Sequence, residues 1–407
     1  MNKGILLVLG CSLLVAILGC GSSSTAPAAP DASLFAANTA RPGSVSALKV
    51  TTGALGVATA FQTAGNSPLT LAVVPDKFLY AGLPTSGGII TTVLGRPAGA
   101  GLTGGLLLMP IQSNVTLETP QLFASGSDYG IIAITPSGSA LYAADQTNNR
   151  LAAFSIDSSK GTLTVIGPQG PPAGVGFDPF SIAIDPQGKF LFVANCDCTA
   201  SHNQGSISVF SINSGTGVLT AVGTFPIGGE ANAHPVAVAV SSDSKFLFVA
   251  SLDDQVYAEN IGSDGTLTDA SVVQLPVAGS RPATIALSTD GKFLYTGNTG
   301  TQRISFLLTC TQNPPSVTGC TNSSGNLVYE SDVPVTGAVG MLVADPAGGF
   351  LYIPDFDHGN ILVFGIATCS GVTVGCTPGS PGQIGLAVNT GGINPFGLAI
   401  APIAASK

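Results

Sequence analysis

A repeated pattern of two short apolar runs joined by a polar turn constrains the fold of this 407-residue chain more than any other feature. The clearest copy is IAIDPQGKFLFVAN, at residues 182–195. Related copies are LAVVPDKFLYAG (71–82), IAITPSGSALYAAD (132–145), VAVSSDSKFLFVAS (238–251), IALSTDGKFLYTGN (285–298), LVADPAGGFLYIPD (342–355) and the half-copy LAIAP (398–402). Successive copies lie 47 to 61 residues apart, and a period of this length is typical of a stacked or circular repeat architecture.

Each repeat continues with two further apolar runs, such as SISVFSI (206–212) and LTAVGTFPI (219–227). Four short runs separated by Gly- and Pro-rich turns, without helical periodicity, predict a four-stranded antiparallel β-propeller blade. The C-terminal run 395–402 supplies only an innermost strand, whereas residues 33–38, 43–50 and 56–61 supply the other three. We therefore expect an all-β, seven-bladed propeller whose composite last blade joins the two ends of the chain and removes an open sheet edge.

The first 32 residues are expected to precede the propeller, which we place at residues 33–403. Residues 1–20 have a Lys followed by an apolar run, which is typical of a secretory signal peptide. The ending ILGC resembles a bacterial lipobox, which implies lipidation of Cys20, and an ordinary cleaved signal is the alternative. Residues 21–32 are rich in Ser, Ala and Pro and predict a flexible tether. By the same resemblance, Ser22 favours the outer membrane, so we expect an exported lipoprotein of the cell envelope.

The composition narrows the classes of partner. Only 9% of the residues are charged and the net charge is −9, which argues against nucleic-acid binding. Polar uncharged residues and glycine must then cover most of the surface. Such a surface is compatible with cations or neutral glycans as ligands but identifies neither. We expect a monomer that is held to a membrane by its lipid and binds a protein or glycan partner. No cofactor is predicted, and a divalent metal is left open.

The blade pattern, with its Asp-Pro-x-Gly-Lys-Phe-Leu turn and Val-Ala-Asn ending, resembles the seven-bladed lactonase-like propellers and the related YVTN-repeat proteins. The family includes propeller-type 6-phosphogluconolactonases, so the resemblance implies hydrolysis of a sugar lactone. In those enzymes a His follows the Pro that opens several innermost strands. The corresponding residues here are Phe180, Val236, Ala283 and Phe396. A phosphorylated substrate also requires clustered basic residues, and the whole chain has 13 Lys and Arg.

Propeller topology places the loops between second and third strands on the same face as the segments that lead into the innermost strands. We expect this face to bind ligands. The ligand-binding candidates on it are Asp145, Asn195, His202, Asp253, Asp254 and Asn298. The alternative is that polar residues occupy these loops only because the strands are buried.

Catalytic chemistry has weaker signals in the sequence. No G-x-S-x-G motif is present. Hydrolysis by a metal-activated water would require converging carboxylates and imidazoles. The candidates on the expected face are His234, Arg281, Asp355, Asp357 and His358.

Six cysteines follow the signal segment, and an even number in an oxidising compartment predicts disulfides. Cys310 with Cys320, and Cys369 with Cys376, would each close an enlarged loop between third and fourth strands. Three alternatives stay open for Cys196 and Cys198: a disulfide across one residue, which needs a turn at Asp197, a metal site with His202, and free or intermolecularly paired thiols.

The sequence therefore favours a binding scaffold that presents a variable loop face, with a lactone hydrolase as the alternative.

Overall fold

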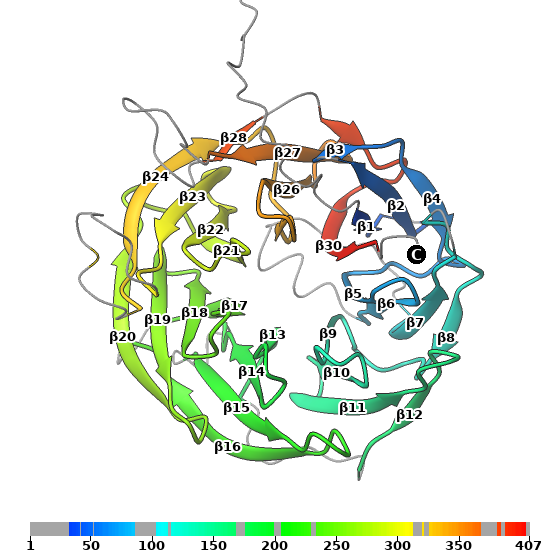
Figure 1. The fold of residues 1–407 in the computed structure, drawn as a ribbon, viewed down its shortest axis with the longest axis horizontal. Helices are drawn as coiled ribbons and strands as arrows, with labels where there is room; N and C mark the ends of the chain where they lie inside the picture. Colours follow the sequence, from blue (N-terminus) through cyan, green and yellow to red (C-terminus); the bar gives the residue numbers. More distant parts are fainter. Residues whose placement is uncertain are drawn as a thin grey trace, which may run out of the picture.

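The seven predicted blades form a closed ring in the computed structural model (Figure 1). The structure describes residues 32–40, 42–51, 53–85, 103–112, 115–167, 176–198, 205–228, 233–311, 320, 325–367, 381–383 and 387–403. Within these residues no helix has the length and apolar character needed to cross a membrane. The predicted signal peptide, Cys20 and residues 21–31 of the predicted tether lie outside the described residues.

The first three blades follow the repeat in chain order. The first comprises β5 (Thr70–Val74), β6 (Phe78–Leu83), β7 (Gly105–Pro110) and β8 (Gln121–Phe123). The second comprises β9 (Ile131–Ile134), β10 (Ala140–Asp145), β11 (Arg150–Ile156) and β12 (Leu163–Val165). The third comprises β13 (Pro179–Ile184), β14 (Phe190–Asn195), β15 (Ser206–Ile212) and β16 (Leu219–Pro226).

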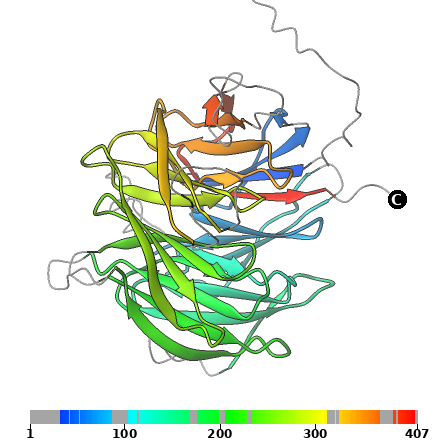
Figure 2. The same cartoon turned by 60° about the vertical axis from the view of Figure 1, so that its left-hand side comes forward.

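The next three blades repeat this order, and Figure 2 shows the successive blades fanned around the ring. The fourth comprises β17 (Pro235–Val240), β18 (Phe246–Ser251), β19 (Gln255–Ile261) and β20 (Leu267–Gln274). The fifth comprises β21 (Pro282–Leu287), β22 (Phe293–Asn298), β23 (Arg303–Leu308) and β24 (Val328–Pro334). The sixth comprises β25 (Val343–Ala344), β26 (Phe350–Asp355), β27 (Asn360–Ile366), β28 (Pro381–Gln383) and β29 (Val388–Asn389).

The seventh blade closes the ring with both ends of the described chain, as predicted. It comprises β30 (Pro395–Pro402), β1 (Ala32–Asn38), β2 (Ser44–Thr51), β3 (Ala54–Leu55) and β4 (Thr59–Gln62). β1 pairs antiparallel with β30, from Ala32 opposite Pro402 to Asn38 opposite Pro395. Figure 1 shows the red β30 beside the blue β1. This pairing satisfies the backbone groups that a free edge would expose.

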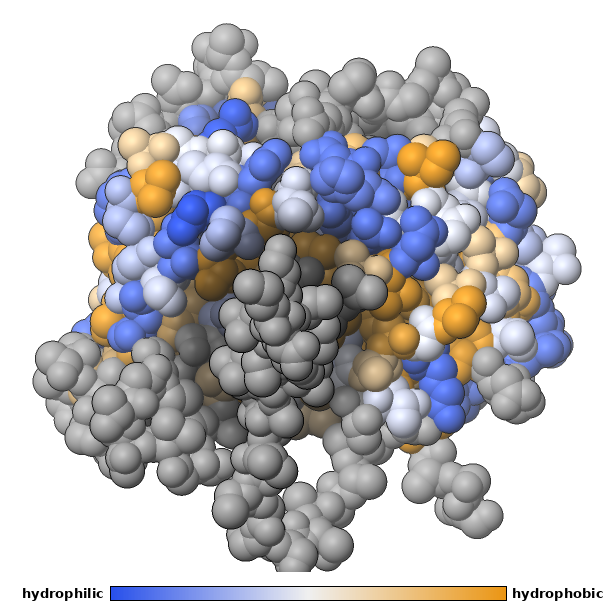
Figure 3. Space-filling view, turned by 90° about the horizontal axis from the view of Figure 1, so that it is seen from above, coloured by the Kyte–Doolittle hydropathy of each residue, from blue (hydrophilic) through white to orange (hydrophobic). Residues whose placement is uncertain are grey.

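The core lies between neighbouring blades. The second strand of every blade, such as β14 or β26, is buried or nearly so along its whole length, because both of its faces pack against adjacent sheets. One cluster joins Phe192 of the third blade to Val249 of the fourth, and equivalent clusters join other pairs. A side view shows hydrophilic and hydrophobic residues interspersed over the coloured surface (Figure 3). This arrangement agrees with the low charge of the chain.

Candidate active site

One face of the ring gathers the lead-in segments of the innermost strands and the loops between second and third strands; we call it the loop face. In several blades the residue after the second strand donates a backbone hydrogen bond to the residue before the innermost strand. Examples are Cys196 N to Asp178 O (2.9 Å), Leu252 N to His234 O (3.0 Å) and Thr299 N to Arg281 O (3.2 Å). In the sixth blade the acceptor lies five residues before β25, where Phe356 N donates to Ala338 O (2.9 Å). The loop face predicted from the sequence is therefore formed by direct contact between the two kinds of segment.

The central end of the loop face is apolar. Leu69, Ile131, Phe180, Val236, Ala283 and Phe396 come from six different blades and belong to one buried cluster, which we call the mouth cluster. The third, fourth and fifth blades each have a register shift immediately after the opening proline, so Phe180, Val236 and Ala283 lie at β-bulges. A bulge turns a side chain away from the regular alternation of a strand. The positions after the opening prolines, where the resemblance implied histidine, thus carry buried apolar side chains.

Three of the predicted ligand-binding residues end second strands and are fully buried. Asp145 binds Arg150 Nε at 2.8 Å, and Asn148 Nδ2 donates to Asp145 Oδ1 at 3.0 Å. Asn195 Nδ2 donates to Ser208 Oγ at 3.0 Å, and Asn298 Nδ2 donates to Ser305 Oγ at 2.7 Å. Asp145 thus bonds to the turn after its strand, whereas Asn195 and Asn298 bond to the third strand of their own blade.

The loop after β18 carries the next two candidates. Asp253 accepts a hydrogen bond from the Tyr257 hydroxyl at 2.7 Å. Asp254 accepts from the backbone N–H groups of Gly279 (2.6 Å) and Arg281 (2.7 Å) in the lead-in segment of the next blade. The Asp254 contacts join the fourth and fifth blades. The sixth candidate, His202, lies outside the described residues.

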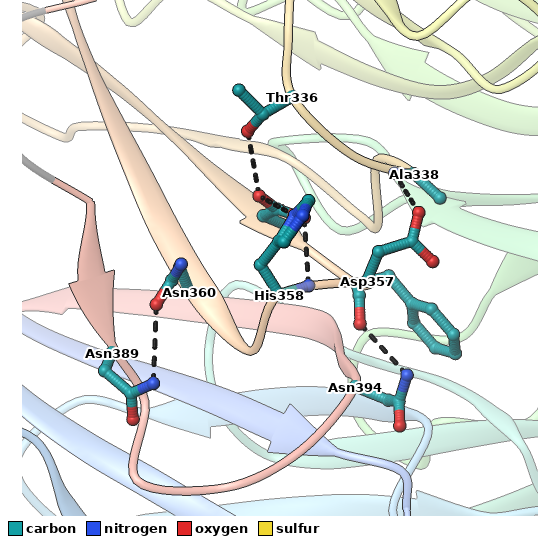
Figure 4. A network of polar contacts seen from close by, with 9 residues as sticks. Thr336, Ala338, Asp357, His358, Asn360, Asn389 and Asn394 are labelled. Atoms are coloured by element: carbon teal, nitrogen blue, oxygen red, sulfur yellow. Dashed lines mark hydrogen bonds and ion pairs between the residues drawn. The ribbon is translucent and has the colours of Figure 1, made fainter.

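The sixth blade brings Asp355 and His358 together. Asp355 ends β26, and its side chain is 2% exposed, whereas that of His358 is 54% exposed. The imidazole Nδ1 lies 2.9 Å from both carboxylate oxygens, and the Thr336 hydroxyl donates to Asp355 Oδ2 at 3.0 Å (Figure 4). A buried carboxylate that holds an accessible imidazole is the arrangement that orients a general base.

Two groups hold this dyad in place. Asp357 Oδ2 accepts from Ala338 N at 3.0 Å, which joins the loop to the lead-in segment of its own blade. Asn394 Nδ2 donates to Phe356 O at 3.0 Å, which joins it to the closing blade (Figure 4). Ala338 and Phe356 belong to the mouth cluster, so the dyad borders the apolar centre of the face.

Gly337 permits the dyad geometry. A Cβ at this position would lie 2.0 Å from Asp355 Oδ1 and 3.1 Å from His358 Nδ1. Any larger residue must therefore displace the carboxylate or the ring. Thr336, Gly337 and Asn394 were not singled out from the sequence, because they lie 18 or more residues from the Asp355–His358 loop and match no motif.

The charges around His358 alter its protonation. The hydrogen bond that the imidazole donates to Asp355 and the negative charges of Asp355 and Asp357 raise the pKa of His358 above its ordinary value. Since the imidazole is half-exposed, solvent moderates this effect. The imidazole therefore exchanges a proton at a higher pH than a free histidine.

The remaining catalytic candidates lie in the lead-in segments of other blades. His234 Nδ1 lies 3.2 Å from the Cys196 carbonyl oxygen, and its backbone N–H donates to Ser251 Oγ at 2.8 Å. Arg281 is exposed and has a positive φ of 49°. The structure thus brings His358, Asp355 and Asp357 into one loop and places His234 and Arg281 in the fourth and fifth blades.

Two disulfides are present in the described residues. Cys310 pairs with Cys320 across a Cα separation of 5.3 Å, as predicted. Cys196 pairs with Cys198 across 5.1 Å, and the intervening Asp197 has a positive φ of 50°, which supplies the expected turn. Cys369 and Cys376 lie outside the described residues. Cys196, Cys198 and His234 bring their ligand atoms within 4.8 Å of one another.

Comparison with known proteins agrees with this architecture. The model of the family "Lactonase, 7-bladed beta-propeller" matches residues 103–200 and 182–284. The fold defines the chain as a seven-bladed β-propeller, and residues 103–284 are similar to this lactonase family.

Two curated relatives carry the name 6-phosphogluconolactonase. The protein of Serratia proteamaculans is 31% identical over 97 residues, and that of Formosa agariphila is 41% identical over 69 residues. These segments cover 24% and 17% of this chain, and only 26% and 18% of the respective relatives.

Solved structures match nearly the whole chain. The periplasmic gluconolactonase of Pseudomonas aeruginosa has a TM-score of 0.69 at 16% identity, covering 91% of this chain and 99% of that one. A protein from Lactobacillus plantarum has a TM-score of 0.68 at 17% identity, covering 91% and 99%. At these identities the likeness establishes the fold alone.

Proposed function

We propose that the protein hydrolyses an unphosphorylated sugar lactone, with His358 as the general base. The observation that carries this proposal is the pairing of the buried Asp355 carboxylate with the half-exposed His358 imidazole on the loop face. The family match and the names of the relatives favour a lactonase over the binding scaffold that the sequence first suggested. The activities named for the relatives belong to those proteins and support only the choice of substrate class.

The chemistry follows from the geometry of the dyad. With Nδ1–H donated to Asp355, the neutral His358 ring presents Nε2 to a water molecule and removes its proton as the oxygen attacks the lactone carbonyl. The ring C–O bond then breaks, and the imidazolium returns the proton to the departing alkoxide, which leaves a hydroxy acid. Asp355 fixes the tautomer and stabilises the imidazolium between the two proton transfers.

Two arginines that begin third strands, Arg150 of β11 and Arg303 of β23, favour a substrate without phosphate. Arg150 is held by Asp145 at 2.8 Å, and Arg303 Nη2 donates to Asp332 at 3.0 Å. Phosphate recognition favours free, bidentate guanidinium groups. The apolar mouth cluster beside the dyad also offers no charge to a phosphate. An aldonolactone satisfies both observations.

A lactone panel tests this proposal. Six-membered and five-membered aldonolactones, with 6-phosphogluconolactone for comparison, are followed by acid release after subtraction of spontaneous hydrolysis, with and without a chelator. We expect chelator-insensitive turnover of an unphosphorylated lactone. Absence of turnover on every lactone overturns the proposal and leaves the binding scaffold as the function to pursue.

The proposal includes the location of the protein, which we expect to be exported and anchored to a membrane by a lipid. The lipobox-like ILGC ending at Cys20 supports attachment to an envelope membrane, which would place the enzyme among extracytoplasmic sugars. Cys20→Ala is expected to move the protein from the membrane fraction to the soluble fraction of an expressing bacterium. Retention of the variant in the membrane fraction would contradict lipidation at Cys20.

A further inference from the structure

The turn after β14 presents two sulfur atoms beside the mouth cluster. Cys196 is fully buried within that cluster, and Cys198 is half-buried against it. The backbone N–H groups of Cys196 and Asp197 donate to Asp178 O (2.9 Å) and Phe177 O (3.3 Å). The left-handed conformation of Asp197 turns the chain so that both sulfurs face the same region. The turn is therefore fixed by the lead-in segment of its own blade.

The third group comes from the next blade. His234 precedes β17, and its backbone is held on both sides, by Ser251 Oγ on its N–H and by Leu252 N on its carbonyl. Its Nδ1 lies 3.2 Å from the Cys196 carbonyl oxygen, which keeps the imidazole against the cysteine turn. Such a hydrogen bond from a ring nitrogen to a carbonyl commonly orients a metal-binding histidine.

The blades approach closely at this point. Gly205 N donates to Ala233 O at 3.0 Å, and a Cβ on Gly205 would lie 2.2 Å from the Pro235 side chain. The distance between the third and fourth blades is thus set by backbone contact. The relative positions of the cysteine turn and His234 do not depend on the bond between the two sulfurs.

We propose that Cys196, Cys198 and His234 form a redox-gated site for a thiophilic cation such as Zn²⁺. Their ligand atoms lie within 4.8 Å of one another, and two thiolates with one imidazole are a donor set that Zn²⁺ binds tetrahedrally, with the fourth position open to water. The site differs from the one expected from the sequence, because His234 from the neighbouring blade takes the place of His202. It does not involve the Asp355–His358 dyad.

The redox step balances as an ordinary thiol–disulfide exchange. A dithiol reductant transfers two electrons and two protons to the Cys196–Cys198 disulfide and is itself oxidised to a disulfide. Binding of Zn²⁺ then releases the two thiol protons, because thiolates are the ligands. The oxidised form has no thiolate at this site, so it does not bind the cation there.

Cobalt binding to the full-length protein tests the proposal. Co²⁺ is titrated into the protein before and after reduction with a phosphine, which does not chelate the metal as a dithiol does. We expect thiolate-to-cobalt absorption in the near ultraviolet only after reduction, saturating at about one Co²⁺ per chain. Zn²⁺ should displace the cobalt. No thiolate absorption after reduction, or equal absorption before it, overturns the proposal.

Variants locate the site. The Cys196→Ser/Cys198→Ser double variant should lose the absorption, and His234→Asn should weaken Co²⁺ affinity by about 10- to 100-fold. The matched control, Cys310→Ser/Cys320→Ser, removes the other described disulfide and should bind as the wild type does. Retained absorption in the first variant, or its loss in the control, contradicts the assignment.

A second measurement does not depend on the folding of any variant. The reduced wild-type protein is alkylated with iodoacetamide, with and without Zn²⁺, and each cysteine is quantified by peptide mass spectrometry. Zn²⁺ should slow the alkylation of Cys196 and Cys198 and leave Cys310 and Cys320 unaffected. Uniform protection, or none, would contradict a site at this turn.

Discussion

At the scale of single residues, the last residue of the second strand matters for both the fold and the candidate activity. Asp145 and Asp355 occupy this same position in two blades and accept hydrogen bonds from the residue three places later. That partner is Asn148 in the second blade and His358 in the sixth. The same bond is thus made by an amide in the second blade and by a titratable imidazole in the sixth.

The dyad predicts a specific pH dependence. Since the base must be neutral and the pKa of His358 is raised, hydrolysis should increase with pH through a midpoint above that of an ordinary histidine. Asp355→Asn removes the principal cause, so the midpoint should move to lower pH while kcat falls. A pH–rate profile of both proteins measures this. An unchanged midpoint in the variant would contradict the role of Asp355.

Gly337 gives a steric test of the same geometry. Gly337→Ala places a methyl group where Asp355 Oδ1 now lies, so the dyad must rearrange. We expect kcat to fall by about 10-fold or more, because misplacement of a catalytic group by about 1 Å is costly. Thermal unfolding serves as the control for the fold. Wild-type kcat in a folded variant would show that the dyad tolerates displacement.

Glu259 predicts a pH-dependent stability that is separate from activity. It is buried in β19 opposite Asp269, and burial together with the charge and hydrogen bond of Asp269 raises the pKa of Glu259 to about 8. A raised carboxyl pKa stabilises the fold at low pH, and this contribution is lost as the pH rises from about 4.5 to about 8. The slope should approach 1.4 kcal/mol for each unit of pH, as about one proton is released.

The Glu259→Gln variant isolates this contribution. Urea unfolding between pH 5 and pH 8 should show a larger loss of stability in the wild type than in the variant. Parallel curves for the two proteins would show that Glu259 ionises in the folded protein as it does in the unfolded chain.

At the scale of elements, the closing blade ties the ends of the chain together. Phe35 of β1 is fully buried, lies opposite Ala399 of β30 and Ala47 of β2, and belongs to the core between the closing and first blades. The phenyl ring of Phe35 packs in this core, so the pairing of β1 with β30 is not the only interaction that closes the propeller. Side-chain packing beneath the paired ends holds them as well.

Phe35→Ala measures this contribution. Loss of the buried ring should lower the free energy of unfolding by about 3–5 kcal/mol. Val57→Ala is the matched control in the same blade, because Val57 is 93% exposed and should change stability by less than about 0.5 kcal/mol. Urea denaturation of the three proteins provides the comparison. Similar effects of the two substitutions would contradict a packed closure.

The strands could be predicted from the sequence because their pattern repeats, and the composite blade followed from counting strands at both ends. The site could be predicted only in part. Asp355 and His358 are close in sequence and lie on the predicted face, so the loop was a candidate. Thr336 and Gly337 come from a separate segment, and the approach of His234 to Cys196 across two blades depends on the distance between blades, which a repeat pattern does not encode.

At the scale of the whole molecule, apolar and polar residues occupy different parts of the propeller. Buried apolar residues fill the spaces between blades and the mouth of the loop face, while polar groups lie on the loops around it. The Asp355–His358 dyad borders the mouth from the sixth blade, and the cysteine turn borders it from the third. The two proposed sites, of different chemistry, therefore lie on the same face of one ring.

The most direct test of the central claim is the kcat/KM for an unphosphorylated aldonolactone in the wild type and in His358→Asn. Asparagine can donate to Asp355 as Asn148 donates to Asp145, so this variant keeps the structural bond and removes the base. Asn148→Ala controls for damage to an equivalent turn. We predict a fall of about 10²- to 10⁴-fold in His358→Asn and wild-type activity in Asn148→Ala. Equal activity of His358→Asn and the wild type would contradict the account.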